Sequence, residues 1–322
     1  MRLLKNRVGG WVLLASWSVA SAGIWGGAAS VLATPQPPKA ESVVADSNAK
    51  SLEGPVTSTE DSLRFVRIDR DGEEPRAMQT AIARYEIQSG PFQGRHVDLV
   101  GAVHIGTKDY YHRLNKLFQS YDALLYELVA DANANRPDLR EEEGGFNPLA
   151  GLQKGMKDAL NLDYQLVEID YSPKNFVHAD MSPSEFAADM KERKDGFVSM
   201  FARLVGAGLA EQANKRAQQQ QSEMLAAMLT KDTMRMRRVI AEQFDRMEGQ
   251  MAGFADKNGK STILTERNRK AFEVLRSELE AGKKKLGIFY GAAHLKDMHE
   301  RLIRDFDAKL IETQWLDAWP LQ

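Results

Sequence analysis

A short pattern that places a histidine just beyond a strand occurs twice in the chain, and it constrains the fold more than any other feature. The apolar run over residues 99–104 ends in Gly-Ala-Val-His, and the run over 289–294 ends in Gly-Ala-Ala-His. An amphipathic helical pattern follows each copy. Open α/β sheets bind their ligands at the carboxyl ends of their strands. The two strand–Gly-x-x-His–helix units therefore predict one site that contains His104 and His294.

The segment between residues 98 and 128 predicts the centre of the fold. A strand over 98–103, a helix over 108–120 and a strand over 123–128 form a compact βαβ unit with parallel strands. We therefore predict an α/β (α+β) domain, built on a mixed sheet with this central βαβ unit and with a strand–Gly-x-x-His–helix unit at each end. Apolar patterns and turn residues predict further strands over 63–68, 81–87, 166–169, 285–290 and 309–314, and helices that begin at 183 and span 264–281.

A long helical stretch separates the two Gly-x-x-His units, and we interpret it as an insertion into one domain, at about 183–254. Ten of the thirteen methionines lie between residues 156 and 251, and the helical pattern breaks at residues 230–232. Two interpretations stay open. The stretch is either a helical hairpin packed on the α/β core, with methionine filling irregular gaps, or a cap that offers an adaptable surface to a peptide or lipid.

The first residues have the pattern of an export signal. Arg2, Lys5 and Arg7 precede an uncharged run over 8–33, which predicts a cleaved signal peptide or an N-terminal anchor. Residues 34–61 are rich in Pro, Ser, Glu and Lys and predict a disordered linker, so 62–322 would form a single domain. We expect export to the bacterial periplasm or cell envelope, with membrane attachment only through an uncleaved N-terminal segment.

Composition excludes several classes of site and partner. The chain has no cysteine, which excludes disulfides, thiolate metal sites and a cysteine nucleophile. A formal net charge of −2 gives no indication of nucleic-acid binding. The partner we expect is a peptide or another small substrate.

Glu127 is a carboxylate inside an otherwise apolar strand. Burying it without a partner would be costly, so it needs a cation, a hydrogen-bond donor or a metal. We expect its strand to lie beside the strand that leads to His104, and the three residues His104, Glu127 and His294 form a ligand set suited to a divalent ion such as zinc, manganese or cobalt. The alternative is an ion pair between Glu127 and an arginine such as Arg267.

Other residues near the predicted strand ends are candidates for catalysis or substrate binding. Arg267 or Asn268 would stabilise a developing oxyanion, and Gly101 and Gly291 would let the main chain turn and approach a ligand closely. The substrate-binding candidates are Tyr110, Tyr111, His178 and Asp180.

The order of these motifs resembles that of the TraB/GumN family, which includes the Tiki ectodomains and is similar to erythromycin esterase-like and ChaN-like haem-binding proteins. The resemblance covers most of residues 98–316 and is weakest in the helical middle. Tiki proteins are described as metal-dependent peptidases without a His-Glu-x-x-His helix, a motif that this chain also lacks. The family's motif positions fall on Gly101, His104, Glu127, Arg267, Asn268, Gly291 and His294.

Two functions from different classes follow. The first is an exported hydrolase, peptidase-like and metal-dependent, in which His104, Glu127 and His294 hold the ion that activates water. A variant of it omits the metal and uses a histidine as general base, oriented by Glu127. The second function is a non-catalytic envelope protein of the same fold that binds a peptide or haem.

Overall fold

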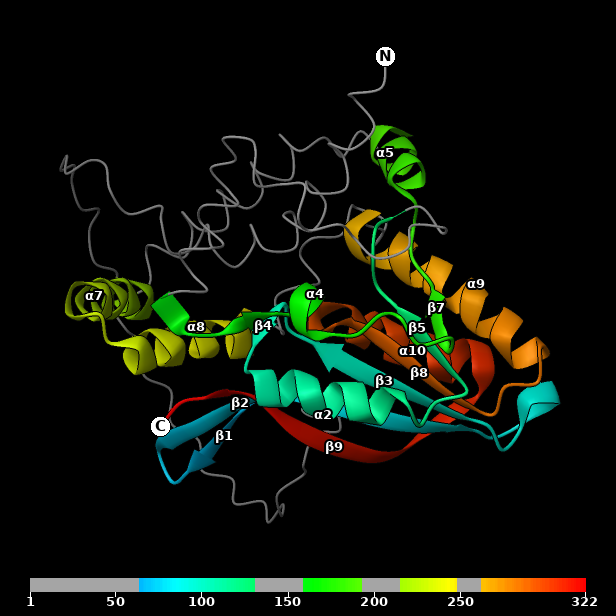
Figure 1. Ribbon diagram of the computed structural model, residues 1–322, viewed down its shortest axis with the longest axis horizontal. Coiled ribbons are helices and arrows are strands. Elements are labelled where there is room, and N and C mark those ends of the chain that lie inside the picture. The colour runs from blue at the N-terminus through cyan, green and yellow to red at the C-terminus, as the bar shows by residue number, and fades with distance from the viewer. Residues whose placement is uncertain (1–63, 131–158, 193–214, 248–261) are drawn as a thin grey trace, which may run out of the picture.

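The computed structural model describes residues 64–130, 159–192, 215–247 and 262–322, and a seven-stranded mixed sheet forms its centre (Figure 1). The strand order is β1-β2-β3-β8-β5-β7, and β9 pairs with β2 as well. The pairs β3–β8, β8–β5 and β5–β7 are parallel, whereas β1, β3 and β9 run antiparallel to β2. The strands are β1 (Val66–Asp71), β2 (Glu74–Ile87), β3 (His96–Ala102), β5 (Ala123–Tyr126), β7 (Phe176–His178), β8 (Lys285–Gly291) and β9 (Ala308–Pro320).

Helices cover both faces of this sheet. On one face α2 (Lys108–Phe118) and the hairpin of α7 (Lys215–Thr230) and α8 (Thr233–Met247) bury one apolar cluster. On the other face α9 (Arg267–Glu280) and α10 (Leu295–Phe306) bury a second. Figure 1 shows α2 in front of the sheet and α10 behind it. The predicted mixed α/β domain is therefore confirmed.

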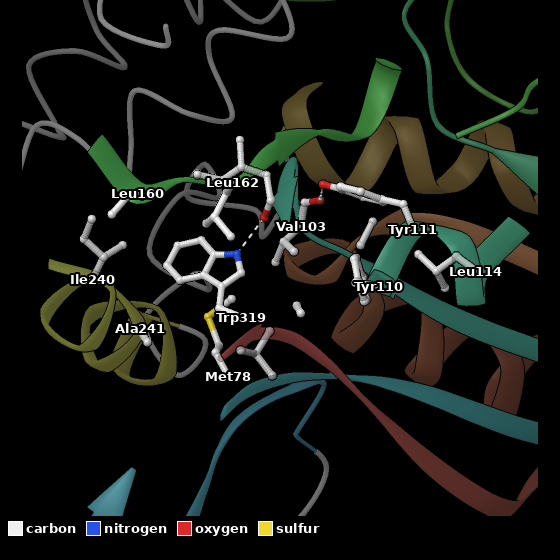
Figure 2. Packing of buried hydrophobic residues seen from close by; sticks show 14 of the residues in the cluster. Met78, Val103, Tyr110, Tyr111, Leu114, Leu160, Leu162, Ile240, Ala241 and Trp319 are labelled. Atoms are coloured by element: carbon white, nitrogen blue, oxygen red, sulfur yellow. Dashed lines mark hydrogen bonds between the residues drawn. The ribbon is translucent and has the colours of Figure 1, made fainter. Parts of the chain in front are cut away.

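The helical hairpin packs on the α/β core, as the first interpretation of the insertion expects. Met224, Met236 and Ile240 are buried in the same cluster as residues of the sheet, and α7 ends at the predicted break. Figure 2 shows Ile240 and Ala241 of α8 beside Trp319 of β9, whose indole N–H donates to the carbonyl of Ile105 at 2.7 Å. None of the helices in the described ranges is long and apolar enough to cross a membrane.

A reciprocal pair of hydrogen bonds starts α5 (Pro183–Glu192) at the predicted residue. The amide of Glu185 donates to Oγ of Ser182 at 3.2 Å, and the amide of Ser182 donates to the carboxylate of Glu185 at 2.7 Å. This arrangement satisfies amides that a helix terminus otherwise leaves without partners.

Three predicted elements differ from the structure. The apolar residues 166–169 do not form a strand: residues Gln165–Glu168 form the short helix α4, which follows β6 (Asp163–Tyr164). The last strand continues past residue 314 to Pro320, because its whole length finds a partner in the long strand β2. The strands of the βαβ unit, β3 and β5, are not neighbours, since β8 lies between them. The predicted signal segment and linker lie outside the described residues, as do parts of the insertion.

Candidate functional site

The carboxyl ends of three adjacent parallel strands meet at one edge of the sheet. His104 follows β3, Glu127 follows β5, and the second Gly-x-x-His begins at the last residue of β8, which runs between them. The carboxylate of Glu127 lies 3.6 Å from Nε2 of His294. The structure therefore brings the predicted carboxylate and the second histidine together at the expected edge. The expectation that the strand of Glu127 lies beside the strand that leads to His104 is wrong, because β8, which leads to His294, lies between them.

Glu127 is held at both carboxylate oxygens. Oε1 accepts a hydrogen bond from Nη2 of Arg267 at 2.7 Å, and Oε2 accepts one from the amide of Gly291 at 2.6 Å. A Cβ atom at Gly291 would stand only 3.2 Å from Oε2. The glycine of the second motif thus lets the main chain approach the carboxylate closely.

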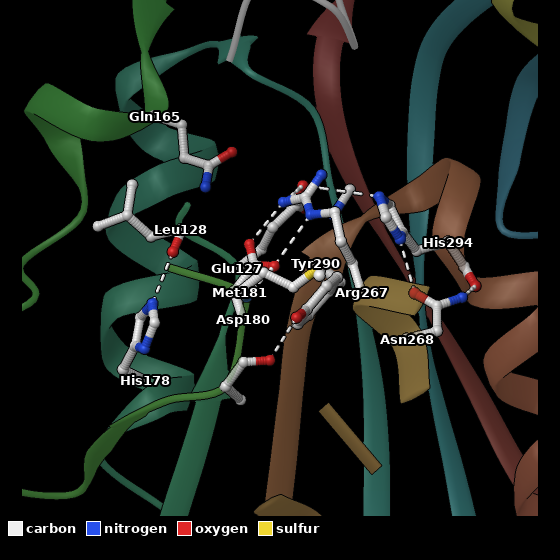
Figure 3. A network of polar contacts seen from close by, with 12 residues as sticks. Glu127, Leu128, Gln165, His178, Asp180, Met181, Arg267, Asn268, Tyr290 and His294 are labelled. Carbon is white, nitrogen blue, oxygen red and sulfur yellow. Dashed lines mark hydrogen bonds and ion pairs between the residues drawn. The ribbon is translucent and has the colours of Figure 1, made fainter. Parts of the chain in front are cut away.

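Arg267 joins Glu127 to Asp180. Its Nε and Nη2 donate to the two carboxylate oxygens of Asp180 at 2.9 and 2.6 Å, and Figure 3 shows the guanidinium between the two acids. The side chains of Arg267 and Glu127 are 3% and 7% exposed, and that of Asp180 is fully buried. Of the two partners expected for Glu127, the ion pair with arginine is formed. Asp180, predicted to bind substrate, belongs to the site because it pairs with Arg267.

This ion pair keeps Glu127 ionised. Burial alone would raise the pKa of Glu127, but the positive charge of Arg267, together with smaller effects of the two histidines and the amide of Gly291, outweighs burial and lowers the pKa to about 2. Burial in turn opposes the charge of Arg267, and Asp180 together with Glu127 raises its pKa above the ordinary value. The site therefore contains a fixed arrangement of one guanidinium and two carboxylates.

Asn268 fixes the ring of His294. Its Nδ2 donates to the carboxylate of Asp297 at 2.8 Å and to the main-chain carbonyl of His294 at 3.1 Å, so its Oδ1 is the acceptor. Oδ1 lies 2.6 Å from Nδ1 of His294, which must then carry the ring proton (Figure 3). Burial lowers the pKa of His294 to about 4 against the attraction of Glu127. At neutral pH the Nε2 atom therefore presents a lone pair toward Glu127.

Arg267 has one nitrogen, Nη1, whose N–H groups are not used in the network. Its three hydrogen bonds use Nε and Nη2 only, and Nη1 bonds to none of the residues that the structure describes. Asn268, in contrast, has both amide hydrogens engaged. Of the two predicted oxyanion donors, Arg267 keeps the N–H groups of Nη1 without a partner among the described residues. Asn268 instead positions His294.

His104 belongs to the same electrostatic environment but is less enclosed. Its side chain is half-buried, and it interacts electrostatically with Glu127 and Arg267. Burial lowers the pKa of His104, so this imidazole is also neutral at neutral pH. Gly291, whose amide bonds to Glu127, and Ala292 are half-buried and Ala293 is exposed, so the network meets the surface along this loop.

Three predicted substrate-binding residues have structural roles instead. Tyr110 and Tyr111 are fully buried, and their hydroxyls donate to the carbonyls of Gly101 and Val103 at 3.0 and 2.9 Å. They support the first Gly-x-x-His and do not border a substrate surface. Nε2 of His178 lies 2.6 Å from the carbonyl of Leu128, which ties β7 to the chain just after Glu127.

Gly101 is needed for packing. A Cβ atom there would meet the carbonyl oxygen of Ala81 at 3.2 Å and the side chain of Leu295 at 3.4 Å. The main chain thus lies close to other protein atoms at both glycines, to Ala81 and Leu295 at Gly101 and to Glu127 at Gly291. The close approach to a ligand stays a prediction. Neither glycine has a positive φ angle.

The donor atoms do not fit the predicted three-ligand metal site as they are arranged. The described ranges contain no group of three or more histidine and acidic side chains placed to hold a metal ion. Nε2 of His294 and Oε1 of Glu127 face each other, but Oε1 already accepts from Arg267. The guanidinium supplies the positive charge that Glu127 needs, and it would repel a divalent ion at the same oxygen.

Two residues of the site were not predicted from the sequence. Asp297 accepts from Asn268 and from Arg301, and Gln165 lies beside His104. The spacing of Asp297, three residues after His294 at the start of α10, could have indicated it. No local signal distinguished Gln165.

Comparison of the chain with protein-family models, with curated proteins and with solved structures found no match. The geometry of the site therefore carries the functional conclusion.

Proposed function

We propose that this domain is an exported hydrolase of the TraB/GumN type that cleaves acyl bonds, with a peptide or another small acyl compound as substrate. The observation that carries the proposal is the neutral imidazole of His294. Its Nδ1 is bonded to Asn268 and its Nε2 faces an ionised carboxylate at 3.6 Å. An oriented neutral imidazole in a buried polar site is suited to general-base catalysis.

In the proposed reaction, Nε2 of His294 takes a proton from a water molecule as the water oxygen attacks the substrate carbonyl carbon. The imidazolium that forms is stabilised by Glu127, whose charge is already fixed by Arg267. The negative charge that develops on the carbonyl oxygen is stabilised by the unengaged Nη1 of Arg267. The proton then passes from His294 to the leaving group as the acyl bond breaks.

An open cleft whose lining includes sequence neighbours of Asp180 and Arg267 is the proposed place for a substrate chain. It has a volume of about 360 Å³ and runs between α5 and α9. Met181, which follows Asp180, and Lys270, one turn after Arg267, both line it. Its lining is mostly charged, which favours a polar chain such as a peptide over an apolar ligand.

The test is hydrolysis of a panel of peptides and simple esters, with products identified by mass spectrometry. His294→Ala should lower kcat roughly 100- to 10,000-fold, the usual contribution of a general base. His299→Ala is the matched control, since His299 lies on α10, the helix that His294 precedes, but bonds to Tyr85 outside the site. Equal activity in wild type and His294→Ala would refute the proposal.

The metal-dependent variant stays a prediction with its own test. Metal content is measured after dialysis in the wild type and in the double variant His104→Ala/His294→Ala, and activity is measured again after zinc, manganese or cobalt is added. Metal bound or restored only in the wild type would support a metal centre. Haem addition tests the binding function: a Soret shift together with no cleavage of any panel member would favour a non-catalytic protein.

A further inference from the structure

The two Gly-x-x-His histidines are each contacted by a residue with a side-chain amide. Asn268 bonds to the main-chain carbonyl of His294 through Nδ2 at 3.1 Å and to its ring through Oδ1 at 2.6 Å. Gln165 bonds to the main-chain carbonyl of His104 through its own backbone amide at 2.9 Å. An amide-bearing residue is thus fastened to the carbonyl of each histidine.

The side chain of Gln165 has an unsatisfied acceptor. Gln165 is 6% exposed, and its Nε2 donates to the hydroxyl of Tyr171 at 3.1 Å, which orients the amide. Its Oε1 is the one buried side-chain polar atom in the described ranges that lacks a hydrogen-bond partner. Leaving such an atom unpaired costs about 1–3 kcal/mol. Buried side-chain oxygens nearly always accept a hydrogen bond, so a donor is expected beside Oε1.

We propose that Gln165 is a positioning residue for His104, equivalent to Asn268 for His294: its Oε1 accepts the ring N–H of His104 and fixes the tautomer. Hydrogen bonding with the side chain of Gln165 raises the pKa of His104 against the larger effect of burial, which lowers it. The other ring nitrogen then carries a lone pair, as Nε2 of His294 does.

The consequence is a site with two oriented neutral imidazoles. His104 and His294 each act electrostatically on Glu127, and each would have one nitrogen held by an amide oxygen. This part of the inference rests on the proposed function, because it assigns the second ring nitrogen of His104 to the reacting groups. The tautomer of His104 itself does not depend on any activity.

The test is nitrogen NMR of the protein labelled at histidine, at about pH 8, where unperturbed imidazoles are neutral. Wild type and Gln165→Glu, which keeps an acceptor oxygen, should show a single tautomer for His104. Gln165→Met, which has a side chain of similar length and no acceptor oxygen, should show a mixture of both tautomers. The tautomer of His294 should be the same in all three proteins and serves as the internal control for folding.

A mixture of tautomers at His104 in the wild type would overturn the proposal, even if Gln165→Met failed to fold. So would a single unchanged tautomer in a folded Gln165→Met protein. If a substrate is cleaved, Gln165→Met should lower kcat with little change in KM, and Gln165→Glu should restore most of it. If nothing is cleaved, the hydrolase proposal fails while the NMR result still decides the role of Gln165.

Discussion

The two Gly-x-x-His motifs have similar sequences and different surroundings. In the second, His294 is 3% exposed, stands directly at the start of α10 and is bonded to Asn268. In the first, His104 is half-buried, and β4 (Ile105–Gly106) and the N-cap residue Thr107 separate it from α2. The amide of Gly291 bonds to Glu127, whereas Gly101 packs against strand β2.

This difference shows how a repeated motif can serve two purposes at one sheet edge. The second copy lies on the central strand β8 and carries both the contact to Glu127 and the enclosed imidazole. The first copy lies on β3, where the hydroxyls of Tyr110 and Tyr111 support its main chain. The second copy is therefore the more enclosed part of the site, and the first is the more exposed part.

The largest effect should come from removing the charge that holds the second copy in place. Arg267→Met leaves Glu127 and Asp180 buried without their cation, and this should lower the free energy of unfolding by about 3–5 kcal/mol. Urea unfolding at neutral pH measures it. Arg269→Met is the control, because Arg269 is exposed and pairs only with Glu266 and Glu273 on the surface. A loss for Arg267→Met as small as that of the control would contradict the assigned role of the ion pair.

A smaller effect should appear in the pH dependence of stability. The pKa of His294 is about 4 in the folded protein against 6.5 for an unperturbed imidazole. Between pH 4 and pH 6.5 the unfolded chain binds more protons at His294 than the folded protein does. The contribution of His294 to the free energy of unfolding is therefore fully present above pH 6.5 and is lost as the pH falls to 4. The shift corresponds to about 3 kcal/mol at most. His294→Gln should remove this part of the acid sensitivity. If the free energy of unfolding changed with pH in the same way in the wild type and in His294→Gln, His294 would not be held neutral by the fold.

The smallest expected effects on stability are those of replacing the two glycines, and they differ between Gly101 and Gly291. Gly101→Ala places a Cβ against the main chain of Ala81 inside the sheet, where little can move, and should lower stability by about 1–3 kcal/mol. The Cβ of Gly291→Ala would come tightly against the carboxylate of Glu127 and would make an ordinary contact with the ring of His294, so only side-chain atoms have to shift. The stability of this variant should fall by less than about 1 kcal/mol, while its activity should fall more than that of Gly101→Ala. Thermal unfolding and product formation measured on both variants check this, and the reverse order would show that the motifs are misassigned.

Local patterns predicted the elements well because their physical causes are local. The strand before each Gly-x-x-His, the start of α5 at Pro183 and the break between α7 and α8 all depend on periodicity and turn residues within a few positions. The need of Glu127 for a partner also followed from the sequence, because a carboxylate in an apolar strand has few options.

Other features depend on contacts between distant segments. The position of β8 between β3 and β5 is a property of the whole sheet, so the sequence could not show that the strand leading to His294 is central. Tyr110 and Tyr111 look like site residues because they follow His104 closely, yet their helix turns them into the core. The run over 166–169 is too short for periodicity to distinguish helix from strand, and Gln165 was missed with it.

The central claim is that the second motif holds a neutral imidazole with its Nε2 atom free beside Glu127. The most direct measurement is an NMR titration of His294, with the ring nitrogens assigned. We predict that the ring keeps the Nδ1–H tautomer at neutral pH and gains a proton only near pH 4. Protonation near pH 6.5, the value of an unperturbed imidazole, or a proton on Nε2 at neutral pH, would contradict the account.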